Sequence, residues 1–243
     1  MTKEADSSKK PSRRKSVAPV GDEAFVSRQL SLFQGFLANT EGQRESLSNA
    51  VDLWDSIPRY AISRVRMGAM RTSDGYLPVM ELPFSYRGRS LTATIYPAQI
   101  KGRDGKWTSF YPSAREELIE HALRKISAEQ QSGFFDEPSY RSGARFSLHQ
   151  LRKELEQQGH SLRYDELVEG LDILSLSAIE IGATNDDGEE AFARSTYLAA
   201  LTGVKRQEYE AAREKRWIAQ FHPLVTQSID QATYRQFNYQ RLM

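Results

Sequence analysis

The stretch Ser147–Leu174, SLHQLRKELEQQGHSLRYDELVEGLDIL, decides the fold expected for this chain. Ser147 followed three residues later by Gln150 is a capping-box pattern, which predicts the start of a helix that ends at Gly159. A second helix is expected after a short turn. The apolar residues that recur at helical spacing, and should face a core, are Leu148, Leu151, Leu155, Leu162, Leu167, Val168, Leu171 and Leu174. Two helices joined by a short glycine-containing turn predict a helix-turn-helix unit.

The segments on either side of this unit extend the pattern to that of a winged helix. Before it, Ser113–Glu116 is another capping box and opens a helix with apolar residues at helical spacing. The segment Gly133–Gly143 then breaks the helical pattern. The elements expected after the unit are strand 177–181, turn 185–188, strands 192–204 and 216–221, and a last helix from Pro223 to Ile229. We therefore expect an α+β fold, a winged helix whose β-hairpin wing lies near 184–191.

An additional hairpin is expected nearer the N-terminus. The β-rich runs 77–86 and 90–96 are separated by Arg87-Gly88-Arg89, a short turn sequence. Leu91, Ala93 and Ile95 alternate with polar residues, so one face of the second strand should be buried. The residues 101–106 that follow form a basic loop. We expect 1–45 to be a disordered arm and 46–243 to be one folded domain, because the first 27 residues are rich in Ser, Lys, Arg, Pro and Gly.

Composition excludes several classes of function. There is no cysteine, which excludes disulfides and thiolate chemistry, and no apolar run is long enough to span a bilayer. The first 15 residues carry charges without an apolar stretch behind them, so they are not a signal peptide. The four histidines lack metal-ligand spacing, and no phosphate-binding loop or nucleophile–base pair is present. We expect a cytoplasmic protein that is not an enzyme and needs no metal, cofactor or membrane.

The basic residues are concentrated where DNA contact is expected. Residues 59–106 carry 9 basic and 3 acidic groups, whereas 110–190 carry 8 basic and 17 acidic groups. Arginine can fork onto phosphate oxygens, and Trp107 or Tyr86 could stack on exposed bases. The residues predicted to contact DNA are Arg64, Arg66, Arg87, Arg89, Lys101, Arg103, Lys106 and Arg163, and the wider basic set also includes Arg59 and Arg71. The second helix of the helix-turn-helix also turns Glu166 and Glu169 outward, so it is a poor reader of the major groove and could pack against a partner subunit instead.

The pentapeptide Gln29-Leu30-Ser31-Leu32-Phe33 lies in the expected N-terminal arm. It places three apolar side chains behind a side-chain amide, with no core of its own to enter. These side chains are therefore available to a pocket on another protein, although a staple onto the protein's own surface is the alternative. The peptide resembles the QL(S/D)LF segment by which bacterial replication proteins bind the sliding clamp, and we expect Gln29, Leu30, Ser31, Leu32 and Phe33 to form a clamp-binding site.

Together these features resemble the plasmid replication initiators of the Rep and TrfA type. The segments that carry the resemblance are Gln29–Phe33, the Ser113-Ala-Arg-Glu-Glu-Leu helix, the helix-turn-helix at 147–174, the wing strands, Phe221–Val225 and Tyr234–Tyr239. The resemblance implies binding to repeated origin sequences in double-stranded DNA, control by a dimer–monomer equilibrium, and recruitment of the clamp, the replicative helicase and the host initiator. In that family a second winged helix follows, whereas this chain ends at Met243, so we expect a dimerising and phosphate-contacting unit.

Two other functions fit the same sequence. A winged helix that dimerises or inhibits a full-length initiator without touching DNA would explain the acidic middle of the chain. A winged-helix transcriptional repressor is the other alternative, and it would not need a clamp peptide.

Overall fold

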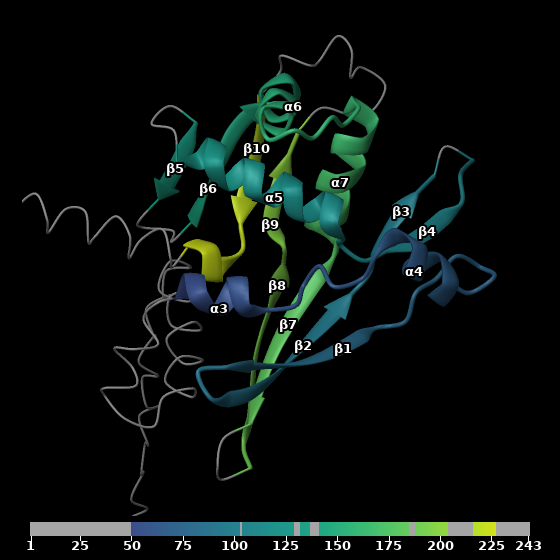
Figure 1. Cartoon of the computed structure of the whole chain (residues 1–243), viewed down its shortest axis with the longest axis vertical. Coiled ribbons are helices and arrows are strands. Elements are labelled where there is room, and N and C mark those ends of the chain that lie inside the picture. Colours follow the sequence, from purple (N-terminus) through teal and green to yellow (C-terminus); the bar gives the residue numbers. More distant parts are fainter. Residues whose placement is uncertain are drawn as a thin grey trace, which may run out of the picture.

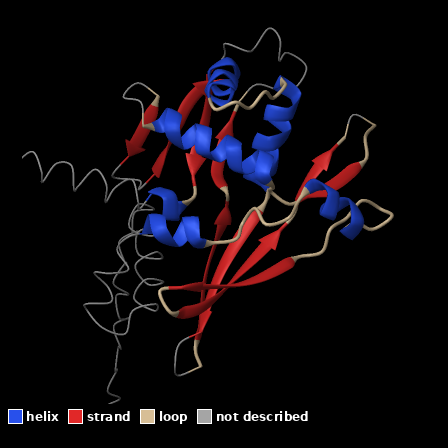
Figure 2. Cartoon of the chain, viewed as in Figure 1, coloured by secondary structure: helices blue, strands red, loops and turns tan. Residues whose placement is uncertain are grey.

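The computed structural model describes residues 50–102, 104–128, 132–136, 141–184, 188–203 and 216–226. It is an α+β structure of antiparallel sheets and helices (Figures 1 and 2). The predictions for Gln29–Phe33, Arg103 and Tyr234–Tyr239 lie outside these residues. None of the helices in the described ranges is both long and apolar enough to cross a membrane.

Three helices pack against a sheet in the order β5-β6-β10-β9 (Figure 2). The helices are α5 (Ala114–Ser127), α6 (Leu148–Gln157) and α7 (Tyr164–Leu176), and the strands are β5 (Gly133–Asp136), β6 (Arg141–Ser147), β9 (Leu198–Thr202) and β10 (Arg216–Phe221). The two helices of the predicted helix-turn-helix are α6 and α7. The predicted core side chains of both are buried, except the half-buried Leu162.

The helix starts follow the capping residues that the sequence contains. The Ser147 hydroxyl accepts a hydrogen bond from the Gln150 amide at 3.1 Å. At the start of α5, the Glu116 carboxylate accepts from the Ser113 amide at 2.9 Å and from its hydroxyl at 2.6 Å. These side chains satisfy backbone groups that a helix end leaves without partners.

Strands β5 and β6 begin at Gly133 and Arg141, within a segment where the sequence predicted only a break. Glycine weakens a strand in general, but it permits close approach of another backbone. A Cβ atom at Gly143 would lie 2.0 Å from the carbonyl oxygen of Ala219 on β10 and 2.7 Å from the Phe134 ring. Glycine at 143 is therefore what allows β6 to pair with β10.

The second sheet has the order β1-β2-β7-β8 and joins two hairpins (Figure 1). The N-terminal hairpin consists of β1 (Met80–Tyr86) and β2 (Arg89–Tyr96), as predicted. Arg87 (φ 49°) and Gly88 (φ 80°) both have positive φ, which is the requirement of a two-residue type I′ turn. Leu91, Ala93 and Ile95 are buried, as the alternation predicted.

The hairpin predicted as the wing lies in this second sheet. It consists of β7 (Ala178–Thr184) and β8 (Glu190–Thr196), and β7 pairs with β2. After β8 the chain passes through the buried Tyr197 into β9, which pairs with β10 in the first sheet. The hairpin that closes the first sheet is therefore β9–β10. Local alternation predicts a strand, but it does not tell which sheet the strand joins.

Buried polar contacts hold the helix α3 (Ala50–Ser56) against the body of the protein. The Trp54 ring stacks on His222 at 4.3 Å between centroids and donates its Nε1–H to the buried Glu120 carboxylate at 2.7 Å. Arg59 and Tyr60 also bind Glu120, and the Tyr197 hydroxyl donates to the Arg59 carbonyl at 3.0 Å. We call Trp54, Arg59, Tyr60 and Glu120 the Glu120 network.

Candidate nucleic-acid interface

A small lobe projects from the second sheet and carries most of the predicted DNA-binding residues. It consists of α4 (Arg64–Met70), the turn 72–76, and the hairpin β3 (Ala98–Lys101) and β4 (Trp107–Phe110) (Figure 1, right). We call it the α4–β4 lobe. Arg71 fastens its parts together, because its guanidinium donates to the Ser109 carbonyl at 2.7 Å and lies 4.9 Å over the Phe110 ring. The Ser109 amide in turn donates to the Gly75 carbonyl at 2.9 Å.

The lobe carries the exposed cations Arg66, Lys101 and Lys106. Arg103, the other predicted cation of the hairpin, is outside the described residues. The acidic residues in the sequence of the lobe are Asp74 and Asp104, and Asp104 accepts a hydrogen bond from the Lys106 amide at 3.1 Å within the hairpin turn. The lobe therefore has a net positive charge, and long cationic side chains there can reach phosphate oxygens.

Arg64 lies at the base of the lobe and has an internal role. Its guanidinium forms an ion pair with the buried Glu116 carboxylate at 3.0 Å and lies 4.8 Å over the Phe110 ring. Burial is the largest influence on Arg64 and lowers its pKa, while Glu116 offsets part of that effect. The Arg64 side chain therefore fixes α4 to α5, and the DNA contact predicted for it stays a prediction.

The remaining predicted DNA-binding residues lie elsewhere. Arg87 and Arg89 are at the turn of the β1–β2 hairpin, at the opposite end of that sheet from the lobe (Figure 1). Arg163 precedes α7 and lies 3.4 Å from Asp165 and 3.5 Å from Glu166. Arg59, from the wider basic set, is buried in the Glu120 network. The structure thus places Arg66, Lys101 and Lys106 on the α4–β4 lobe and places Arg87, Arg89 and Arg163 away from it.

Exposed apolar side chains accompany these cations. About half or more of the surface is exposed in each of Val65, Tyr76, Val79 and Trp107. Trp107 is therefore available for stacking, as the sequence predicted, whereas Tyr86 is buried and is not. The exposure of Tyr76 was not predicted, although the turn sequence 72–75 beside it indicates a side chain at the surface.

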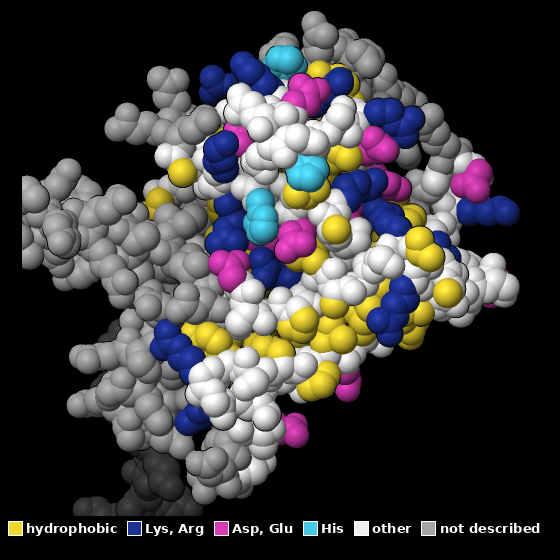
Figure 3. Space-filling model, viewed as in Figure 1, with side chains coloured by type: hydrophobic (Ala, Val, Ile, Leu, Met, Phe, Trp, Pro, Cys, Tyr) yellow, Lys and Arg dark blue, Asp and Glu magenta, His cyan; other side chains and the backbone are white. Residues whose placement is uncertain are grey.

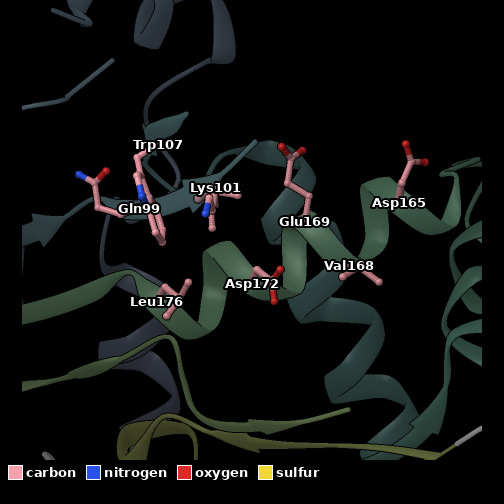
Figure 4. A pocket seen from close by; sticks show the side chains of 9 residues that line it. Gln99, Lys101, Trp107, Asp165, Val168, Glu169, Asp172 and Leu176 are labelled. Atoms are coloured by element: carbon pink, nitrogen blue, oxygen red, sulfur yellow. The ribbon is translucent and has the colours of Figure 1, made fainter. Parts of the chain in front are cut away.

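The helix α7 turns its carboxylates toward the lobe. Asp165, Glu169 and Asp172 line a cavity of about 210 Å³ between α7 and the β3–β4 hairpin (Figure 4). The Glu169 carboxylate accepts a hydrogen bond from Arg115 at 2.8 Å. The face of α7 that would enter a major groove is therefore acidic and is partly covered by the β3–β4 hairpin. This agrees with the expectation that α7 is a poor reader of base edges.

A band of apolar side chains lies beside this region (Figure 3). The strand β1, at an edge of the second sheet, carries the half-buried Met80, Leu82 and Phe84, which pack on the core. Among the described residues β1 is an edge strand, so another protein chain could cover this apolar surface.

Comparison with known proteins gives distant structural likenesses. No family model matches the chain, and no curated protein matches it. The crystal structure of domains 2 and 3 of RctB aligns with 77% of this chain and 60% of that chain, with 10% identity and a TM-score of 0.45. A second crystal structure of RctB domains 2–3 aligns with 66% of this chain and 56% of that chain, with 10% identity and a TM-score of 0.40. The chain thus spans about three fifths of the length of the chains it matches.

Proposed function

We propose that this chain is a DNA-binding unit of a plasmid replication initiator of the Rep and TrfA type, built on a winged helix. The element order supports the winged-helix assignment: helix α5, strand β6, helices α6 and α7, then strands β9 and β10, with β6, β10 and β9 adjacent in one antiparallel sheet. In this assignment β9 and β10 are the wing strands, and β7–β8 is an insertion that forms the second sheet with β1–β2. Its role is binding, without a catalytic step, in the cytoplasm.

The observation that carries the proposal is the cationic surface of the α4–β4 lobe. Lys101, Lys106 and Arg66 are exposed on one projecting unit, and a side chain that contacts a phosphate releases condensed counterions from DNA. The carboxylates of α7 oppose its entry into a groove. We therefore propose that the lobe holds the backbone of double-stranded origin DNA, and that the sequence of the repeated sites is read mainly by other parts of the initiator.

Sedimentation of the protein with and without an origin-length duplex, at several salt concentrations, tests this proposal against the alternatives. The proposal predicts a protein–DNA complex at low salt that dissociates steeply as salt rises. A protein that self-associates but never sediments with DNA would instead support a dimerisation module. Duplex binding whose affinity does not change with salt would contradict the phosphate-contacting role of the lobe.

We further propose that Gln29–Phe33 binds the bacterial sliding clamp and so brings the replisome to the origin. Replacing both Leu32 and Phe33 with Ala removes the two largest apolar anchors of the peptide. Clamp affinity is therefore expected to fall by at least about 100-fold, because a few apolar anchors carry most of the binding energy of such contacts. Surface plasmon resonance on immobilised clamp measures this loss, and duplex DNA binding serves as the control that should not change. Clamp binding that survives the double substitution would show that the peptide is not the contact.

The apolar band on β1 favours a second activity alongside DNA binding. Met80, Leu82 and Phe84 are only half buried and belong to an edge strand, so a second copy of the chain could cover them. We propose homodimer formation through this edge. Sedimentation of the protein alone distinguishes a dimer from a monomer.

A further inference from the structure

The cavity between the β3–β4 hairpin and α7 is small enough to suit a single ring. Its volume is about 210 Å³, below the roughly 300–1,000 Å³ of pockets that enclose drug-sized ligands. Trp107 and Leu176 border one end, and their side chains are 52% and 56% exposed although both are large and apolar. Figure 4 shows Trp107 above the end of α7 that carries Leu176. A flat ring placed between them would cover both.

The hairpin places a donor and an acceptor beside the tryptophan. Lys101 and Trp107 are direct cross-strand partners, so they project from the same face of the hairpin. Gln99, two residues before Lys101, also lines the cavity. Its side-chain Nε2 donates to the Ser109 hydroxyl at 2.7 Å, while its side-chain oxygen is buried without a hydrogen-bond partner among the described residues.

The opposite wall consists of hydrogen-bond acceptors on α7. The carboxylates of Asp165, Glu169 and Asp172 line the cavity along successive turns of the helix. Carboxylates accept hydrogen bonds from the N–H groups of a base, and a lysine ammonium donates to ring nitrogen or carbonyl oxygen. The cavity therefore combines an aromatic stacking surface with several acceptors and one cation.

We propose that this cavity binds one unpaired nucleobase of a DNA strand and prefers guanine. Guanine offers N–H donors at N1 and N2 to the carboxylates, and acceptors at O6 and N7 to Lys101. Thymine offers a single N–H between two carbonyl oxygens, which the carboxylates would repel. In a duplex these Watson–Crick donors are already paired, so the site takes only a base that is out of the stack.

This inference rests on the proposed DNA-binding function and makes it more specific. The cations that hold the backbone belong to the same lobe, since Lys106 and Trp107 are consecutive residues. The carboxylates of the cavity repel phosphate, so the backbone must follow the outer surface of the lobe while the base turns inward. A protein that holds duplex DNA by the lobe could in this way also retain a strand that has opened beside it.

Intrinsic fluorescence gives a direct readout, because the three tryptophans of the chain differ in exposure. Trp54 and Trp217 are buried, with 0% and 4% of their surface exposed, whereas Trp107 is 52% exposed. The probes are a 12-nucleotide oligo-dT strand and the same strand with one central dG. We expect the dG strand to bind at least fivefold more tightly and to quench the fluorescence, because stacking a base on an aromatic side chain contributes substantially to affinity.

Substitutions in the cavity should remove the preference without unfolding the protein. Trp107→Leu is expected to abolish the quenching and the dG preference, and Asp172→Asn is expected to reduce the preference. Lys153→Gln, an exposed change on α6, is the control that should retain both. Circular dichroism of each variant checks the fold.

The outcomes separate this inference from the proposed function. Equal affinity for the two strands, or dG-dependent quenching that persists in Trp107→Leu, overturns the base site while salt-dependent duplex binding leaves the proposed function standing. Failure of the protein to bind either a single strand or a duplex overturns both.

Discussion

Replacing Glu120 with Ala is expected to destabilise the protein by about 3–5 kcal/mol, the typical cost of removing one partner from a buried ion pair. Glu120 is buried and binds Trp54 Nε1 at 2.7 Å, the Arg59 guanidinium at 3.4 Å, and the Tyr60 hydroxyl. Without it, the buried guanidinium of Arg59 keeps its charge but loses its buried counter-ion, leaving Asp55 at 3.2 Å, a half-exposed carboxylate, as its ion-pair partner. The loss of stability should be greatest in α3, because the Glu120 network holds α3 to α5.

Urea unfolding measured by far-ultraviolet circular dichroism tests this expectation. Glu117→Ala is the matched control. Glu117 is a glutamate in the first turn of the same helix and is not buried. Its effect should stay within about 0.5 kcal/mol, as for most surface substitutions. A loss below about 1 kcal/mol for Glu120→Ala would mean that water or rearranged side chains satisfy Arg59, and that the network does not hold α3 in place.

Acidification is expected to remove about 1.4 kcal/mol of stability per pH unit through His222 alone. His222 is buried against Trp54, and its Nδ1 accepts a hydrogen bond from the Leu224 amide at 3.1 Å, so it caps the helical turn 223–226. Burial, with a smaller contribution from Arg59, lowers the pKa of His222 from 6.5 to about 3. The folded state favours the neutral imidazole. The stability that depends on His222 is therefore fully present above pH 6.5 and is lost as pH falls toward 3.

The measurement is the free energy of unfolding in urea at pH 7.5, 6, 5 and 4. His222→Asn provides the control, since asparagine can still cap the turn but does not titrate in this range. As pH falls, the free energy of unfolding of the wild type is expected to decrease more steeply than that of the variant. The difference in slope should correspond to about one proton taken up on unfolding, or about 1.4 kcal/mol per pH unit. Parallel curves for the two proteins would show that His222 is solvated or already charged in the folded state.

Local patterns in the sequence predicted the elements that depend on local interactions. The capping serines Ser113 and Ser147 and the Arg87-Gly88 turn act within a few residues, so α5, α6 and the β1–β2 hairpin begin or turn where predicted. The pairing of β7 with β2 could not be predicted in this way. It joins residues more than 80 positions apart, and the alternation of β7 would suit either sheet.

The candidate site was predicted in part, for a similar reason. Lys101, Lys106 and Trp107 lie in one basic turn of the sequence, and they remain together in the α4–β4 lobe. Arg59 and Arg64 looked equivalent to them, but each has a buried carboxylate partner on α5, 52 or more residues away. The cavity against α7 likewise depends on how the hairpin packs, which charge and periodicity do not specify.

The most direct test of the α4–β4 lobe as the DNA contact is the salt dependence of duplex affinity in matched double variants. Lys101→Gln with Lys106→Gln removes two exposed charges of the lobe, and Arg141→Gln with Lys153→Gln removes two exposed charges from β6 and α6. Fluorescence anisotropy at several salt concentrations gives the slope of log K against log salt. The lobe variant is expected to lower the magnitude of this slope by about 1.8, or about 0.9 for each lost phosphate contact, while the control keeps the wild-type slope. An unchanged slope in the lobe variant, together with a reduced slope in the control, would place the DNA on the helical face and contradict the lobe as the phosphate contact.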